Sequence, residues 1–361
     1  MKFTLLIFAL IGFAFGAPLH AQLELDRPEN HGGFNSFAFS PDGKSIAGGT
    51  GVVTFRVDGV ESKRGGDVVL WDAASGKIRE ILGSHEGSAP DWVAYDEGGT
   101  TIASASTENG LLKFWTANGK PLAKPIETGG KIADGPNGYG VLVRLSPDGT
   151  AAFSVLANER TFGKITVKDG GELACWDTKT GKKKWSIEDS ALNLIALSSD
   201  GGLIAGFENR VGKYVQDGDS VRHEEVTRAL VFRSTGDGKE VKRIDMTKSR
   251  VRPRAMMFDP ASSDLFGVTS SGIHRIRFDS GETEELFKWD KANRGANSVA
   301  ISADGKKIAR CGTKFIEVAD FASGKPIVIL EAKFLFNLNF SSDLSRAAGS
   351  SQGPKVYDLK P

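Results

Sequence analysis

The sequence has little of what several classes of protein require. Only two cysteines, Cys175 and Cys311, occur in 361 residues. Both lie within expected strands, so we expect small buried hydrophobes and no disulfide. The five histidines are scattered and show no metal-ligand spacing, so the sequence predicts no metal site and no cofactor. A G-x-S-x-G spelling around Ser351 leads into a strand, which favours a serine-rich hairpin over the nucleophile elbow of a hydrolase.

An excess of charge is also missing. The chain has 46 basic and 45 acidic residues, and the two signs balance once residues 1–21 are left out. A neutral domain has no bulk electrostatic attraction to nucleic acid or anionic lipid. We therefore expect no nucleic-acid partner.

Long hydrophobic runs are limited to the amino terminus. Lys2 is followed by an uncharged apolar run from about Phe3 to Ala17 and then by small residues, which is the order of a secretory signal peptide. The run is shorter than the roughly 20 residues of a membrane-spanning helix, so we favour cleavage over a retained anchor. The expected leader covers residues 1–21 with cleavage after Ala21, and cleavage after Gly16 is the second choice. The mature domain would then span residues 22–361 and be secreted or periplasmic, with no stable membrane insertion.

Glycine is abundant, at 44 residues, and a strand-and-turn phrase recurs along the chain. "FAFSPDG" returns as "VRLSPDG", "IALSSDG" and "VAISADG", with looser copies between them. The seven copies lie 39 to 61 residues apart, and their strands end at Phe39, Tyr95, Leu145, Leu197, Phe258, Ile301 and Phe340. This periodicity predicts an all-β fold, a seven-bladed β-propeller of four-stranded antiparallel blades.

A second phrase follows each copy of the first, as in "VVLWDAASGK" and "LACWDTKTGK". Because of these phrases and "FSPDG", residues 22–361 resemble the WD-repeat family of β-propellers. The resemblance is to an exported, bacterial-type member whose repeats are degenerate. The resemblance implies a structural role for the motif residues Trp71, Asp72, Trp115, Trp176, Asp177, Tyr357, Asp358 and His85. Members of the family commonly have a buried, hydrogen-bonded set of His, Ser or Thr, Asp and Trp in each blade. Only the second copy has similar residues at these positions, namely His85, Thr107, Asn109 and Trp115.

The two chain ends are expected to close the ring. The seventh copy ends at "VYDLKP" after three strands, while the mature chain begins with a spare strand from Gln22 to Arg27. We expect this segment to be the outer strand of the last blade, because pairing it there removes an open sheet edge.

Three long inserts separate the second and third strands of their blades, at residues 50–66, 158–171 and 208–225. The resemblance places them on the same face as the links between blades. Arginine and aromatic residues are enriched at binding hot spots, so this face is the candidate binding surface. Its candidate residues are Arg210, Arg250, Arg252, Trp289, Arg294 and Tyr139.

The function predicted from these features is a monomeric, non-enzymatic scaffold that binds a protein or peptide partner through the loops of this face. The alternative is an enzyme or small-ligand receptor with its site at the mouth of the central channel, which predicts converging carboxylates or histidines. A subunit of a larger envelope complex is a third possibility.

Overall fold

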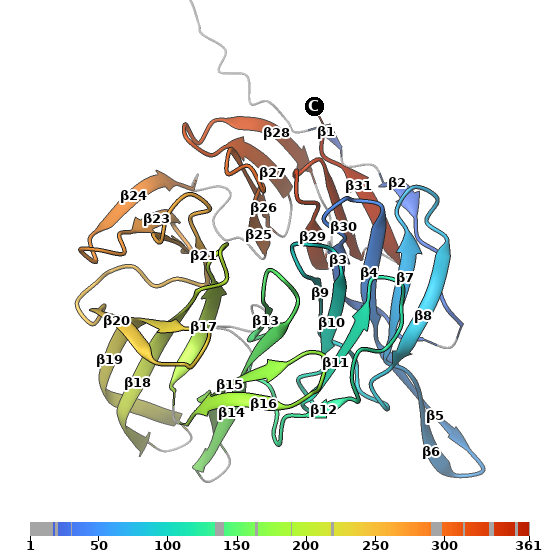
Figure 1. Cartoon of the computed structure of the whole chain (residues 1–361), viewed down its shortest axis with the longest axis horizontal. Coiled ribbons are helices and arrows are strands. Elements are labelled where there is room, and N and C mark those ends of the chain that lie inside the picture. The colour runs from blue at the N-terminus through green and yellow to red at the C-terminus, as the bar shows by residue number, and fades with distance from the viewer. Residues whose placement is uncertain are drawn as a thin grey trace, which may run out of the picture.

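The structure is a computed structural model that describes residues 17–18, 21–29, 31–133, 141–162, 165–188, 190–217, 220–289, 298–312, 315–331, 336–350 and 353–360. Within these ranges the regular secondary structure is entirely β, and seven antiparallel sheets stand around a common centre (Figure 1). The predicted all-β, seven-bladed propeller is therefore confirmed.

Each blade contains four antiparallel strands, and in blade six β1 (Ala17–Pro18) adds a fifth strand to the sheet. Blade one contains β3 (Phe34–Phe39), β4 (Ser45–Thr50), β7 (Asp67–Asp72) and β8 (Ile78–Ser84). Blade two contains β9 (Trp92–Tyr95), β10 (Thr101–Ala105), β11 (Leu111–Thr116) and β12 (Ile126–Glu127). Blade three contains β13 (Val143–Leu145), β14 (Ala151–Phe162), β15 (Ile165–Asp177) and β16 (Lys183–Ile187).

The remaining blades follow the same order. Blade four contains β17 (Leu192–Leu197), β18 (Leu203–Asp217), β19 (Ser220–Ser234) and β20 (Glu240–Asp245). Blade five contains β21 (Ala255–Phe258), β22 (Leu265–Val268), β23 (Gly272–Ile276) and β24 (Thr283–Lys288). Blade six contains β25 (Ser298–Ile301), β26 (Lys307–Cys311), β27 (Phe315–Asp320) and β28 (Pro326–Glu331). Blade seven contains β29 (Phe336–Phe340), β30 (Arg346–Ser350), β31 (Pro354–Asp358) and β2 (Ala21–Glu24).

The amino-terminal strand closes the ring as expected. Strand β2 runs antiparallel to β31, with Leu23 opposite Val356 and Glu24 opposite Lys355. Leu25 then enters the core beside blade one, where only 3% of it is exposed. The expected leader lies mostly outside the described residues. Of its described residues, the two that form β1 (Ala17–Pro18) pair in parallel with β28. No helix in the described ranges is long and apolar enough to span a membrane.

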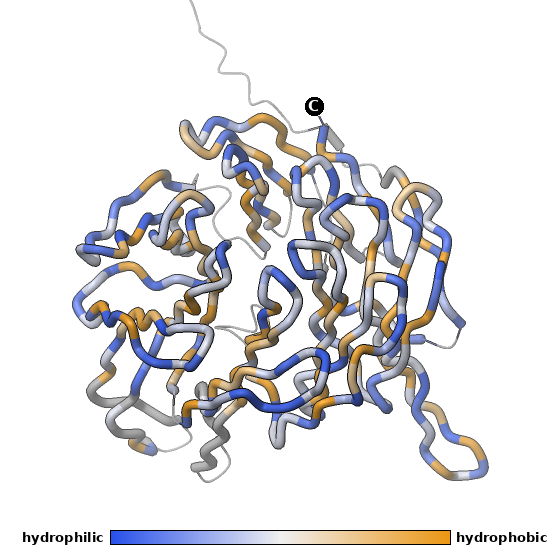
Figure 2. Tube along the Cα trace, viewed as in Figure 1, coloured by the Kyte–Doolittle hydropathy of each residue, from blue (hydrophilic) through white to orange (hydrophobic). Residues whose placement is uncertain are grey.

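The hydrophobic core is divided among the blade interfaces. Seven apolar clusters occupy the seven interfaces between neighbouring blades, including that between blade seven and blade one. Figure 2 shows apolar segments in every blade and polar residues at many of the turns. Each blade buries both faces against its neighbours, so no blade is complete without the ring.

The recurring phrase encodes one turn between the first and second strands of a blade. In five blades the serine hydroxyl donates to the aspartate two residues later, at 2.6 to 2.7 Å, and accepts the backbone N–H five residues later at 2.9 Å. In the first of these turns Gly43 has a φ of 68°, a left-handed value that favours glycine. The repetition of "SPDG" and its relatives therefore reflects a local side-chain requirement.

The aromatic motif residues of the third strands are buried, and the aspartates that follow them accept hydrogen bonds in the next turn. The rings of Trp71, Trp115, Trp176 and Tyr357 are all buried. Asp72 and Asp177 each accept two backbone N–H groups and one hydroxyl in the turn that follows. Asp358 accepts the backbone N–H of Lys360 at 3.2 Å.

The hydrogen bonds around His85 differ from the expected family set. His85 is fully buried, and its Nε2 lies 2.7 Å from Ser104 Oγ on β10. Thr107 lies beyond the end of that strand and donates to Asp91 at 2.6 Å instead. The Trp115 indole donates to the Leu82 carbonyl at 3.1 Å. Of the expected set, Asn109 donates to the His85 carbonyl at 3.0 Å, whereas β10 places Ser104 and not Thr107 against the imidazole.

Candidate functional site

The three inserts fold as hairpins that extend beyond the blades. In the longest, residues 210–217 of β18 and 220–227 of β19 pair only with each other. At about 3.4 Å per residue, eight residues extend roughly 27 Å. The insert of blade one forms a separate two-stranded arm of β5 (Val52–Val57) and β6 (Val60–Gly65), which points away from the ring in Figure 1. Long hairpins of this kind present surface that the ring does not cover.

The β5–β6 arm is amphipathic. Asp58 and Gly59 have φ values of 51° and 80°, the two positive values that a type I′ hairpin turn requires. Because side chains alternate along a strand, Val53 and Val57 share one face of the arm. Val57 pairs directly with Val60. These three valines are 38%, 53% and 66% exposed, in that order along the chain. The arm therefore exposes an aliphatic face to solvent.

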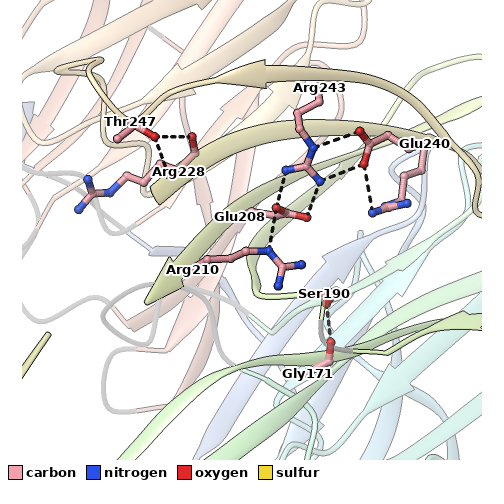
Figure 3. Close-up of polar contacts among 9 residues, drawn as sticks. Gly171, Ser190, Glu208, Arg210, Arg228, Glu240, Arg243 and Thr247 are labelled. Carbon is pink, nitrogen blue, oxygen red and sulfur yellow. Dashed lines mark hydrogen bonds and ion pairs between the residues drawn. The ribbon is translucent and has the colours of Figure 1, made fainter. Parts of the chain in front are cut away.

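An ion-pair network holds the base of the β18–β19 hairpin (Figure 3). Glu208, only 2% exposed, receives both terminal nitrogens of Arg243 at 2.7 and 3.2 Å. Arg210 Nε lies 3.4 Å from the same carboxylate, and Arg243 also contacts Glu240 at 2.9 Å. These hydrogen bonds, first that to Glu208, raise the pKa of Arg243 above its usual range. Arg210 is thus part of this network.

The other predicted binding residues are in different environments. Arg250 and Arg252 are exposed on the link between blades four and five. Burial and then the charge of Arg228 lower the pKa of Arg252, which indicates a cluster of positive charge there. Arg294 and Tyr139 lie outside the described residues.

Trp289 does not belong to the accessible surface. It is 8% exposed, its indole donates to the Thr269 carbonyl at 3.0 Å, and the Arg310 guanidinium lies 4.3 Å from its ring centre. Arg310 belongs to blade six and is itself buried against Glu317. Trp289 therefore packs between blades five and six, where little of its ring is exposed.

A second candidate region is the central cavity, which measures about 780 Å³. All seven blades contribute to its wall at the ends of their innermost strands. The strand-ending residues of the repeat line it, namely Phe39, Tyr95, Leu145, Leu197, Phe258, Ile301 and Phe340. Its charged lining residues in the described ranges are Arg144, Asp96 and Glu97, and no histidine lines it. The channel-site alternative predicted carboxylates or histidines converging from several blades, and the two described carboxylates of the lining both come from blade two.

Arg144 is the cation of this cavity. Its Nη1 donates to the carbonyl oxygens of Val143 at 2.7 Å and Val141 at 3.2 Å. Among the described residues no carboxylate forms an ion pair with it. Burial lowers the pKa of Arg144 to about 10, so the guanidinium remains charged at neutral pH. A guanidinium has five N–H donors, and the two carbonyls accept from one nitrogen.

The two carboxylates of the cavity are held differently. Asp96 is buried and accepts the backbone N–H groups of Thr100 and Thr101, both at 2.7 Å, and the Thr100 hydroxyl at 2.8 Å. Glu97 is exposed at the rim, where partial burial and then the charge of Asp96 raise its pKa. Asp96 therefore has a structural role in its turn.

The described residues contain no group of three His, Cys, Asp or Glu side chains that could hold a metal ion. Cys175 and Cys311 are both buried and free, as expected. Burial raises the pKa of Cys175 to about 11 and that of Cys311 to about 12, so neither is a reactive thiol.

These features define the chain as a seven-bladed β-propeller. No family model matches its sequence, and no curated protein matches it. Among solved structures, it is similar to hydrazine synthase of Kuenenia stuttgartiensis, with a TM-score of 0.60 and 14% sequence identity. The match covers 94% of this chain and 99% of that one. At this identity the likeness concerns the fold alone.

Proposed function

We propose that this propeller is an exported, non-enzymatic, WD-repeat-like scaffold that binds a protein partner through its hairpin face. The observation that carries the proposal is the aliphatic face of the β5–β6 arm. Val53, Val57 and Val60 are 38% to 66% exposed on a hairpin with only two strands. An isolated two-stranded hairpin is marginally stable in water, so a partner that covers the aliphatic face would stabilise the arm as well as the complex.

The partner expected for this surface has an apolar patch flanked by carboxylates. Arg64 is opposite Val53 and therefore shares the valine face of the arm, with its guanidinium 4.8 Å from the Phe55 ring, whereas Arg56 is on the other face, opposite Glu61. Arg250 and Arg252 add exposed positive charge on a link between blades. Because the ring holds the hairpin bases in place, binding orders fewer residues and loses less conformational entropy.

Export rests on the order of residues 1–21, with Lys2 before an apolar run and small residues at its end. Mass spectrometry of the protein purified from its native cell should give Gln22 as the first residue. A chain that still begins at Met1 in the cytosolic fraction would remove export from the proposal.

The scaffold role is tested by quantitative crosslinking and affinity capture with the mature protein as bait. In one variant Val53, Val57 and Val60 are changed to threonine, which keeps the β-branched shape and removes the apolar surface. A second variant carries Arg250→Ala and Arg252→Ala. The matched control changes two exposed residues of the outer strand β28, Ile327→Thr and Ile329→Thr, which are 42% and 37% exposed.

The arm variant should lose at least about tenfold of the captured partner, which corresponds to about 1.4 kcal/mol. The arginine variant should bind more slowly and depend less on salt. The β28 control should capture the same partner as the unmodified bait. Equal recovery by the arm variant and the control would refute the role of the arm.

A further inference from the structure

The central cavity lies at the opposite end of the ring from the hairpin arms. Strand β3 runs towards the turn after Phe39, while its antiparallel neighbour β4 runs towards the β5–β6 arm. The cavity is lined at the turn end, by Phe39, Pro41 and their counterparts in other blades. It is therefore separate from the surface assigned to the protein partner.

We propose that this cavity binds a small organic anion with an apolar body, whose carboxylate pairs with Arg144. The wall supplies the apolar part. Trp92, Leu145, Met257 and Val299 line the cavity, and each keeps some exposed surface. A volume of about 780 Å³ is within the usual range for small-molecule sites, which are mostly apolar with a few placed polar groups.

The charge of Arg144 determines the sign of the ligand. Arg144 is half-buried in the cavity wall, and a partly desolvated cation gains free energy when a partner of opposite charge replaces the remaining water around it. Here two neutral carbonyls accept from one nitrogen of Arg144, and no described carboxylate pairs with it. The planar guanidinium presents paired donors that match the two oxygens of a carboxylate. A ligand carboxylate would thus complete the hydrogen bonding of this side chain.

The acidic residues of the lining set the orientation of the ligand. Asp96 is already occupied by three donors from Thr100 and Thr101, and Glu97 is at the exposed rim. A negative rim repels a second anionic group, so the ligand carboxylate should be at the inner end beside Arg144. A monocarboxylate with an aliphatic or aromatic body fits this arrangement better than a dicarboxylate.

The test uses two probes and the mature protein. Binding of 8-anilinonaphthalene-1-sulfonate, an apolar anion, is followed by its fluorescence, and it is then displaced by decanoate or by decylammonium below their micelle concentrations. We expect one bound probe per chain and displacement by decanoate at a concentration at least about tenfold lower than by decylammonium. Preference for decylammonium, or no binding by either anion, would overturn the proposal.

Variants locate the site. Arg144→Met should weaken both anions at least about tenfold, since hydrogen bonds to charged groups are among the stronger ones, and Arg144→Lys should retain part of the affinity. Arg277→Met, a control at an exposed arginine paired with Asp264 and Glu284, should change nothing. Ala94→Phe keeps Arg144 and fills the cavity, so it should block both probes even if Arg144→Met does not fold. Unchanged binding in Arg144→Met or in Ala94→Phe would place the probe elsewhere and refute the site.

Discussion

Replacing Leu25 by alanine tests how the amino-terminal strand contributes to the ring. Leu25 is 3% exposed and belongs to the cluster that contains Phe34, Trp71 and Val356. Removing a buried leucine side chain typically costs 2 to 5 kcal/mol, so we expect a loss of about 3 kcal/mol. For a domain of residues 22–361, an unfolding entropy of about 2.1 cal/mol/K per residue converts this loss to a Tm lower by about 4 °C.

Differential scanning calorimetry measures the shift, and Ile81→Ala is the control because Ile81 is 50% exposed on β8. The control should change the free energy of unfolding by less than about 0.5 kcal/mol. A double-mutant cycle with Val356→Ala adds a direct test of contact between the chain ends, with an expected coupling of at least about 0.5 kcal/mol. A Tm unchanged within 1 °C for Leu25→Ala, together with zero coupling, would mean that the strand does not close the ring.

Three further predictions concern buried and titrating groups. Glu317→Ala should lower the free energy of unfolding by about 3 to 5 kcal/mol, because it removes the carboxylate that pairs with the buried Arg310 guanidinium. The double variant Arg310→Met with Glu317→Leu should be close to neutral in urea unfolding. The free energy of unfolding should fall on acidification in two pH ranges. Burial lowers the pKa of His85 to about 3, so the contribution of the neutral imidazole to stability is complete above pH 6.5 and is lost towards pH 3. For Asp343, hydrogen bonds from Ser341 and Ser345 outweigh burial and lower the pKa to about 2, so its contribution is present above about pH 4 and lost towards pH 2. Calorimetry across pH should show that His85→Gln removes the pH dependence of stability between pH 6.5 and 3, and that Asp343→Asn removes it between about pH 4 and 2. Variants with the same pH profile as the unmodified protein would contradict both assignments. Cys175 and Cys311 should not react with Ellman's reagent in the native protein and should both react in guanidinium chloride, while rapid native labelling would disprove their burial.

The architecture could be predicted from the sequence because its signals are local. Ser40, Asp42 and Gly43 satisfy one turn through bonds that span at most five residues, so the same letters return wherever that turn is built. The closing strand could also be predicted, since a seventh copy with three strands leaves one sheet edge open and the chain begins with a spare strand.

The candidate sites depend on contacts between blades, which local patterns do not contain. Trp289 follows an outer strand and has the sequence context of a loop residue, yet Arg310 from the next blade covers its ring. Arg144 is one polar residue in an otherwise apolar strand, and its place in a cavity follows only from the radius of the closed ring. The exposed valines of the arm did have a signal, the alternating "VVTFRVDGVE" with an Asp-Gly turn, but their exposure depends on how far the arm extends beyond blade one.

The pairing of Leu23 with Val356 also fixes the order in which the molecule can be assembled. Protein synthesis proceeds from the amino terminus, so β2 emerges before the four strands of each of blades one to six, whereas its partner β31 emerges after them. Contacts between residues so distant in sequence are slow to form. Strand β2 is therefore among the last to pair, and a nascent chain interrupted before β31 holds an incomplete ring with an exposed edge.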